Sequence, residues 1–348
     1  PETVSAGWWP TAHVQGIAVD RVKGHIYFSF TTVLVKTDLW GNLLGTVRGL
    51  TGHLGDLTFD PGSRMVLGSL EYKAAGAFYI AMFAADAITT PDRDASDPRV
   101  MRTVHLAEVA EDFGSPSSVH GPGPDTPGRY GCSGIDGIAI GPDFRDRRSR
   151  RVTVAYGVYS GADRADNDHQ ILLQFSPRGW WDRLARPLVE AAPHRSGPRR
   201  AAGKYFVRTG NTTFGVQNLE YDAQLDRWFL GVYAGRKPAF PNFTLFALDG
   251  RARPRRRVLG GLGGERGAEL PLADVGLLDS ATGIRGWHQK ADVGIASLGD
   301  GLFYLSSDGA RNGLQTSDLA LSRWSGDPAR PFVPVDARNG RPTPAPIR

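Results

Sequence analysis

The pattern of Gly134-Ile-Asp-Gly-Ile-Ala-Ile-Gly141 occurs in four other segments of the 348-residue chain, and this repetition is the main evidence for the fold. Each copy has a polar residue near its start, then a short apolar strand, and then a turn that carries Asp or Gly. The other copies are residues 13–20, 53–60, 215–222 and 292–298. Such self-similarity indicates repeated units, each of which buries its apolar side chains only against its neighbours.

Two further apolar segments follow each copy. Second strands are expected at residues 26–30, 65–70, 152–159, 228–233 and 302–306. Third strands are expected at residues 33–37, 77–83, 170–175, 243–248 and 319–324, and a fourth follows most of them, as at 43–47, 100–106 and 332–335. This pattern predicts an all-β fold, a five-bladed β-propeller with four-stranded antiparallel blades around a central channel. A two-sheet sandwich also uses short strands, but it does not predict the same pattern five times.

The composition agrees with a single large β domain. The chain has 44 Gly and 24 Pro, which suit many tight turns, and its one Cys excludes a disulfide framework. No linker is evident before the Pro-rich end, so we expect one propeller domain over residues 1–338 and a flexible C-terminal tail over 339–348.

Charge and hydropathy limit the expected partners. The net charge is +5, and the Arg clusters are not interleaved with aromatic residues as a nucleic-acid platform would be, so no nucleic-acid partner is expected. No run of 18 apolar residues occurs, so no membrane partner is expected. Because the chain starts at Pro1 without a signal-like apolar segment, we expect a processed protein that is secreted or periplasmic.

The topology of a propeller places the functional site. Inner strands start at one face of the disc, and the connections between second and third strands and between blades lie at that same face. The excess length of the chain also falls in such connections, at residues 112–131, 176–203 and 260–290. Long loops gathered at one mouth of the channel are a usual way to build a pocket, so the site is expected there.

The residues predicted at this mouth come from three kinds of position. The starts of the inner strands supply His13, Gln15, His53, Asp56, Asp136, Gln217, Asn218 and Asp292. The connections between second and third strands supply Glu71, Tyr72, Lys73, Arg164, Tyr233, Lys237 and Asp308, and the segment before the fifth copy supplies Trp287 and His288. A mouth with carboxylates, amides, His and aromatic rings suits a polyhydroxylated ligand, and the cationic side chains would also admit an anionic one.

Three acidic residues at the mouth suggest a reaction. Cleavage of a glycosidic bond needs one protonated and one ionised carboxyl group. Asp136 and Glu71, from neighbouring blades, are the predicted pair, and Asp56 is expected close enough to shift the pKa of the acid. No cofactor is firmly implied, although His13, His53 and His288 could hold a divalent metal.

This arrangement resembles the five-bladed propeller glycosidases, including the arabinanase and fructosidase group, in which three acidic residues at the mouth do the work. The resemblance implies a glycoside hydrolase acting on a poly- or oligosaccharide. Where those families place an Asp at the start of the first blade, this chain has Gln15 beside His13. That grouping resembles instead the metal-bearing mouth of propeller polysaccharide lyases that act on uronates, which is the alternative reaction. In a third alternative the propeller binds glycan or protein without catalysis, but the five mouth positions differ, which favours one asymmetric site on the axis.

Overall fold

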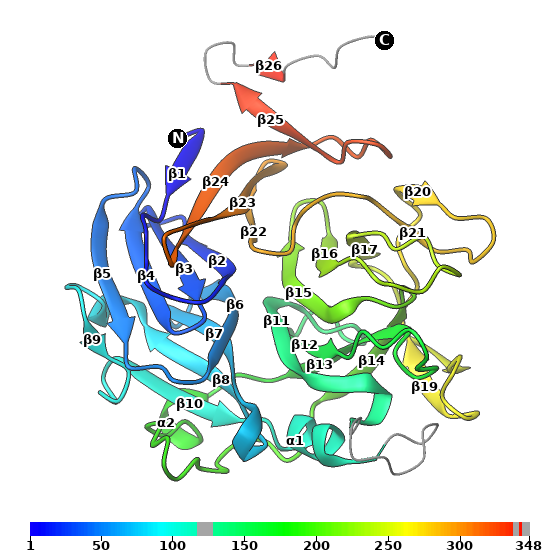
Figure 1. The fold of residues 1–348 in the computed structure, drawn as a ribbon, viewed down its shortest axis with the longest axis horizontal. Helices are drawn as coiled ribbons and strands as arrows, with labels where there is room; N and C mark the ends of the chain where they lie inside the picture. The colour runs from blue at the N-terminus through cyan, green and yellow to red at the C-terminus, as the bar shows by residue number, and fades with distance from the viewer. Residues whose placement is uncertain (117–127, 337–340, 343–348) are drawn as a thin grey trace.

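The computed structural model describes residues 1–116, 128–336 and 341–342, and in this part of the chain five β-sheets surround a central axis (Figure 1). The five-bladed β-propeller is therefore confirmed. The innermost strands are β2 (Val14–Asp20), β6 (His53–Asp60), β11 (Cys132–Pro142), β15 (Thr213–Asp222) and β22 (Ile295–Gly299). Each begins within three residues of the start of its repeated segment, so the repeat marks the inner strands.

The second and third strands also follow the predicted pattern. The second strands are β3 (His25–Phe30), β7 (Met65–Tyr72), β12 (Arg150–Val158), β16 (Arg227–Tyr233) and β23 (Leu302–Arg311). The third strands are β4 (Val33–Asp38), β8 (Ala77–Ala84), β13 (His169–Phe175), β17 (Leu245–Asp249) and β24 (Leu314–Trp324). All adjacent pairs within these triplets are antiparallel, as expected for strands joined by short turns.

The outer strands differ most from the prediction. Fourth strands are β5 (Leu43–Arg48), β10 (Met101–His105), β14 (Gly203–Arg208) and β25 (Phe332–Asp336), while the described part of the fourth sheet has three strands rather than four. The strands that follow it, β18 (Arg255–Val258) and β19 (Arg266–Glu269), extend the third sheet instead, through a parallel pairing of β19 with β14. Leu259 and Leu262, which lie between β18 and β19, are buried in one cluster with Phe206 of β14. This apolar contact holds the two added strands on the third blade.

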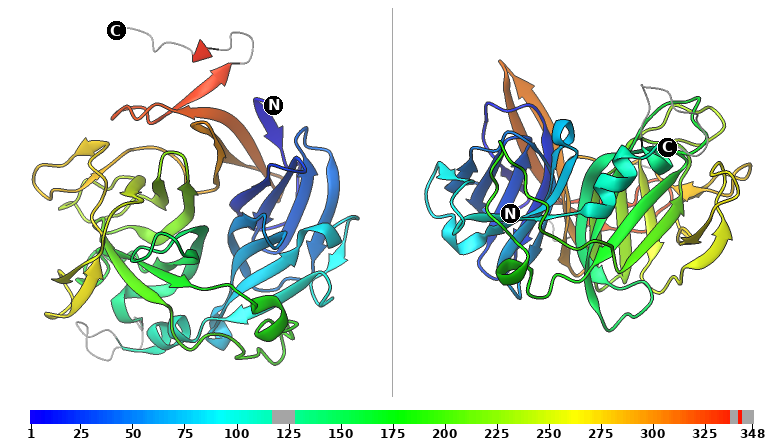
Figure 2. Two further views of the ribbon diagram at one scale, coloured as in Figure 1. Left: turned by 180° about the vertical axis from the view of Figure 1, so that it is seen from behind. Right: turned by 90° about the horizontal axis from the view of Figure 1, so that it is seen from below.

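The ring closes through the N-terminus. The short strand β1 (Thr3–Ser5) pairs antiparallel with β24 of the last sheet, so the two lie side by side (Figures 1 and 2). The tail predicted over 339–348 lies outside the described residues, except for β26 (Arg341–Pro342), which pairs with β25. No helix in the described ranges is long and apolar enough to cross a membrane.

The core lies between the blades. Each pair of neighbouring blades shares one cluster of buried apolar side chains, five clusters in all among the described residues. Between blades four and five, for example, the rings of Phe229 and Phe303 pack edge to face with centroids 5.4 Å apart. Burial between blades therefore holds every inner strand at a fixed distance from the axis.

The segment 176–202 was expected as a loop at the mouth, but most of it packs against the second blade. It includes the short helix α2 (Trp180–Arg183) and then runs along the outer edge of the second blade, where Arg186 forms a bridge with Thr103 and the Ser196 carbonyl accepts the N–H of His105. Leu188 is buried with the core between blades one and two. The segment 176–202 therefore connects blade three to blade two. The helix α1 (Ala107–Gly114) packs on β8 and β11.

Irregular pairing occurs at the same place in four inner strands. The register shifts between Val14 and Gly16 in β2, and corresponding shifts occur at residues 54–57 of β6, 135–138 of β11 and 216–218 of β15. These bulges hold the polar residues of the repeat. Since an extra residue in a strand re-aims the neighbouring side chains, the bulges change the direction in which these residues point.

Candidate functional site

A cavity of about 800 Å³ lies at the face where the inner strands start. Nine predicted residues line it, namely His13, Gln15, His53, Glu71, Tyr72, Lys73, Asp136, Gln217 and Tyr233. They come from blades one to four, so the cavity is asymmetric. Thr51, Gly52, Ala74, Ala75, Ser133, Glu190 and Phe214 complete the lining.

Three titratable side chains meet at its floor. His53 opens β6 and pairs directly with Glu71 at the end of β7, while Asp136 lies in the bulge of β11 on the next blade. The His53 Nδ1 atom lies 3.5 Å from Glu71 Oε1 and 3.7 Å from Asp136 Oδ1. One ligand atom from each of the three residues lies within 4.8 Å of the others, and this is the one such group of three among the described residues.

Glu71 is fixed from both of its oxygens. Its Oε2 atom accepts the backbone N–H of Ile135 at 3.1 Å, and its Oε1 atom lies 2.9 Å from the Lys73 ammonium. Gly134 has a φ of +133°, and a Cβ there would lie 2.0 Å from Glu71 Oε2. The glycine that opens the quoted repeat is thus needed for the backbone to approach this carboxylate.

Asp136 is less completely bonded. Its Oδ2 atom accepts the Gln217 side-chain amide at 3.2 Å, while its Oδ1 atom has no hydrogen-bond partner in the described part of the chain. The side chain of Asp136 is 10% exposed and that of Glu71 is 2% exposed. Of the two carboxyl groups, Asp136 therefore has the greater access to the cavity.

Burial changes the charge of this group. It raises the pKa of Asp136 well above its usual range, and the nearby Glu71 carboxylate raises it further. Burial also raises the pKa of Glu71, although the Lys73 ammonium opposes that shift. Burial and then Lys73 lower the pKa of His53 to about 4, so the imidazole is neutral at pH 7. Lys73 pairs with Glu71, whereas no Lys or Arg of the described residues pairs with Asp136.

The walls contain residues that the sequence did not single out. Glu190 comes from the segment that clamps blade two, and its Oε1 accepts hydrogen bonds from the Tyr72 hydroxyl at 3.0 Å and the Thr51 N–H at 2.9 Å. Phe214 is 50% exposed and has a φ of +64°, which is uncommon for an aromatic residue. Its place just before the repeat copy at 215–222 is the sequence signal that could have identified it, whereas Glu190 has no local signal.

Asp56 requires a correction, because it lies among the inner strands below the cavity rather than in it. It is 1% exposed, and its Oδ2 atom accepts the backbone N–H groups of Ile138 and Leu219 at 3.0 and 2.9 Å. A Cβ on Gly16 would lie 2.5 Å from Asp56 Oδ1, which shows how closely the first blade approaches. Asp56 therefore joins blades two, three and four at the axis and does not contact the cavity.

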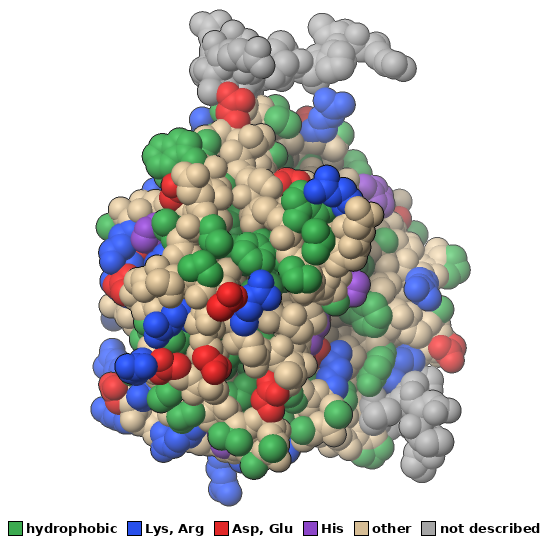
Figure 3. Space-filling model, turned by 60° about the vertical axis from the view of Figure 1, so that its left-hand side comes forward, with side chains coloured by type: hydrophobic (Ala, Val, Ile, Leu, Met, Phe, Trp, Pro, Cys, Tyr) green, Lys and Arg blue, Asp and Glu red, His purple; other side chains and the backbone are tan. Residues whose placement is uncertain are grey.

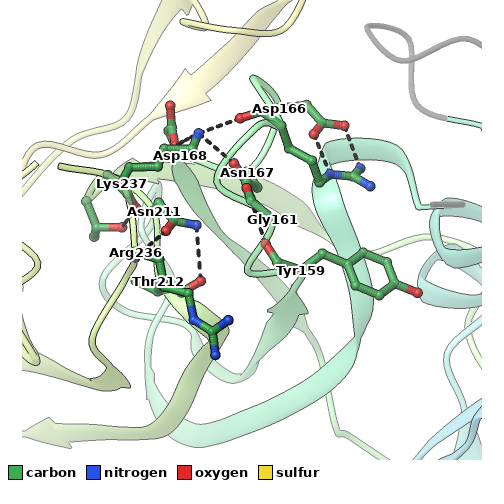
Figure 4. Close-up of polar contacts among 12 residues, drawn as sticks. Tyr159, Gly161, Asp166, Asn167, Asp168, Asn211, Thr212, Arg236 and Lys237 are labelled. Carbon is green, nitrogen blue, oxygen red and sulfur yellow. Dashed lines mark hydrogen bonds and ion pairs between the residues drawn. The ribbon is translucent and has the colours of Figure 1, made fainter. Parts of the chain in front are cut away.

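Arg164 and Lys237 are also placed outside the cavity, in a buried cluster between blades three and four (Figure 4). The Arg164 guanidinium pairs with both oxygens of Asp166, each at 2.8 Å. The Lys237 ammonium donates to Asn167 Oδ1, to Asp168 Oδ1 and to the backbone carbonyl of Arg164. These contacts join the β12–β13 connection to the β16–β17 connection. Arg164 and Lys237 therefore stabilise two loops of the mouth and do not line the cavity.

Five more predicted residues do not line the cavity, and Asp292 is one of them. Asn218 is fully buried and donates to the backbone carbonyls of Gln15 and Gln217. Trp287 is 1% exposed and packs edge to face on Trp324 in the core. His288 is exposed and packs on Phe243, and Asp308 pairs with Lys290. Since His288 is not at the cavity, the predicted metal set of His13, His53 and His288 is not assembled.

The outer surface carries both signs of charge. In the face shown in Figure 3, Lys and Arg side chains alternate with Asp and Glu, without a continuous region of one sign. Among the ion pairs of the described residues, Arg64 contacts both the buried Asp20 and the half-exposed Asp86.

Comparisons with known proteins leave the family open. No protein-family model matches the sequence, and no curated protein matches it. The solved structures that are similar to this chain include the following three. A protein of unknown function from Bacteroides caccae is 9% identical, with 77% of this chain and 88% of that chain covered and a TM-score of 0.30. A luciferin-regenerating enzyme is 10% identical over 88% and 90% of the chains, with a TM-score of 0.34, and the Dos1 propeller is 11% identical over 92% and 68%, with a TM-score of 0.36. No functional argument rests on these similarities.

Proposed function

We propose that the cavity is the active site of a glycoside hydrolase in which Asp136 is the acid and Glu71 is its ionised partner. The observation that carries the proposal is the meeting of these two carboxyl groups at the floor of an 800 Å³ cavity, with ligand oxygens no more than 4.8 Å apart. Glycosidases that retain the anomeric configuration use carboxyl groups about 5–5.5 Å apart, whereas inverting enzymes need about 6.5–9.5 Å to admit a water molecule. The separation supports a retaining reaction.

The different surroundings of the two carboxyl groups support different roles. The Lys73 ammonium and the Ile135 N–H both favour the ionised form of Glu71. Asp136 has the higher tendency to keep a proton, because burial and the charge of Glu71 both raise its pKa. The Lys73 side chain is about half exposed, so it can swing away from Glu71 when substrate enters.

The walls suit a sugar. Tyr72, Tyr233 and Phe214 supply aromatic surface for the apolar faces of sugar rings. The side chains of Gln15 and His13 can hydrogen-bond to hydroxyl groups. A few polar groups converging on a partly aromatic cavity is the usual composition of a small-molecule site.

The test is a screen of plant, algal and bacterial polysaccharides for released oligosaccharides. The wild-type chain should release products from at least one polysaccharide, and Asp136→Asn and Glu71→Gln should each lose at least about 10²-fold in rate, because each removes one half of the acid and base pair. Glu111→Gln, an exposed carboxylate on α1 paired with Arg200, is the matched control and should keep full activity. Retained turnover in both cavity variants would overturn the proposal.

The second candidate is a lyase that acts on uronate-containing glycans. The observation that favours it is the cationic Lys73 at the cavity floor, which would neutralise a substrate carboxylate. The two reactions differ in product, because β-elimination leaves a double bond that absorbs in the ultraviolet and hydrolysis does not. An increase in ultraviolet absorbance during turnover would therefore support the lyase in place of the hydrolase. Sugar binding without any product would support a binding function in place of both enzymes.

A further inference from the structure

We propose that His53, Glu71 and Asp136 form a binding site for one divalent transition-metal cation of the zinc class, open to solvent through the cavity. The inference does not depend on which reaction the cavity performs, because it is argued from the geometry of these three side chains. The cation site differs from the three-histidine set expected from the sequence, since it needs two carboxylates and uses His53 alone of those histidines.

The separations between the donor atoms fit a shared cation. His53 Nδ1 lies 3.5 and 3.7 Å from the nearest oxygens of Glu71 and Asp136, which is too long for hydrogen bonds. In a tetrahedral zinc site with bonds of about 2.1 Å, neighbouring ligand atoms lie about 3.4 Å apart. The two measured separations therefore match ligands around a shared cation better than partners in a hydrogen bond.

Two of the donor atoms have no hydrogen-bond partner among the described residues. Asp136 is buried, and its Oδ1 atom, which faces His53, accepts no hydrogen bond from the described residues. The Nδ1 atom of His53 is likewise without a hydrogen-bond partner in the described ranges. A buried carboxylate oxygen without a partner is costly, and a cation would satisfy both atoms at once.

The remaining contacts define how the site would be supported. Glu71 and Asp136 are each held by a second oxygen, through the Ile135 N–H and the Gln217 amide respectively. Such bonds orient the ligating oxygen and are typical of protein metal sites. The Lys73 ammonium forms an ion pair with Glu71 Oε1. A bound cation would take the place of this ammonium as the positive partner of Glu71. Its half-exposed side chain can move into the cavity when a cation binds.

The ligand set indicates the chemical class of the cation. One imidazole nitrogen with two carboxylate oxygens suits Zn²⁺ and Co²⁺, while Ca²⁺ and Mg²⁺ prefer oxygen ligands alone. Three protein ligands with a free position toward a cavity are characteristic of zinc sites that bind water or substrate.

The test is calorimetric titration of the metal-stripped, tag-free chain with Zn²⁺, together with the visible spectrum of Co²⁺. One equivalent should bind, and His53→Ala and Asp136→Asn should each weaken binding by at least about 10-fold. His13→Ala is the matched control, because it removes a histidine of the same cavity that is not a ligand, and its affinity should stay that of the wild type. Lys73→Met should tighten binding about 3- to 10-fold, since it removes a like charge beside the cation.

Absence of binding, or equal loss in His53→Ala and His13→Ala, would overturn the cation site. Circular dichroism of each variant separates loss of ligands from loss of fold, and Glu71→Gln provides a further ligand variant if Asp136→Asn is unfolded. The readouts contain no sugar, so failure to find a glycan substrate leaves this test intact. If hydrolysis is found and Zn²⁺ binds without slowing it, the acid role of Asp136 is wrong while the cation site stands.

Discussion

Asp56 provides the strongest test of how the inner strands are held at the axis. Its carboxylate Oδ2 accepts two backbone N–H groups, those of Ile138 at 3.0 Å and Leu219 at 2.9 Å, and both belong to other blades. The replacement Asp56→Ala removes this acceptor and leaves two buried donors without their partner. Asp56→Asn keeps one oxygen of the same shape and serves as the matched variant.

The expected loss can be worked from these two bonds. A buried donor left unsatisfied costs about 1–3 kcal/mol, so Asp56→Ala should lower the free energy of unfolding by about 2–6 kcal/mol. Asp56→Asn should cost less than about 2 kcal/mol, because its amide oxygen can still accept both N–H groups. Neither change touches the lining of the cavity, so the affinity for Zn²⁺ should stay that of the wild type.

The assay is urea unfolding followed by tryptophan fluorescence, with free energies taken from linear extrapolation. Trp228 and Trp287 are both buried, so unfolding should change their emission. Equal stability of Asp56→Ala and the wild type would refute the structural role of Asp56. A loss of Zn²⁺ affinity in folded Asp56→Asn would show that it acts on the cavity after all.

Three further outcomes are expected. Gly134→Ala should displace Glu71, because a Cβ there would lie 2.0 Å from its Oε2, and Zn²⁺ affinity should fall at least about 10-fold; unchanged affinity would contradict this. Burial raises the pKa of Glu220 to about 8, so the stability it contributes is complete below its unfolded pKa near 4.5 and is lost as the pH rises through 8. Glu220→Gln should therefore reduce the fall in unfolding free energy between pH 5 and pH 9, and an unaltered fall would exclude Glu220 as its source. Phe214→Ala should weaken binding of the best oligosaccharide about 10-fold with little change in melting temperature, because the ring is half exposed, and equal binding by calorimetry would exclude its contact with sugar.

The sequence predicted the parts of this molecule that repeat. Each inner strand has its own copy of the pattern, and propeller topology then places Glu71 and Asp136 at one face although they are 65 residues apart. The bulge at each copy could not be derived from the pattern, because it depends on how neighbouring inner strands pack. That packing is why Asp56 points below the cavity while Asp136 borders it.

Segments outside the repeat could not be placed by the same reasoning. The long connection after β13 bonds to the second blade, so Glu190 meets Tyr72 from 118 residues away. The strands after β17 join the third sheet because Leu259 and Leu262 are buried there. Trp287 was expected at the mouth, but its side chain is buried and its indole N–H donates to the backbone carbonyl of Asp327. In each case a distant apolar or polar partner decides the position, and local pattern carries no information about it.

Catalysis by Asp136 is tested by comparing the release of oligosaccharides by the wild-type chain and by Asp136→Asn over the polysaccharide panel, with melting temperatures recorded in parallel. We expect turnover of at least one polysaccharide by the wild type and at least about a 10²-fold lower rate in the variant, at a melting temperature within a few degrees of the wild type. Equal rates for the two proteins, or no product from any polysaccharide, would contradict it.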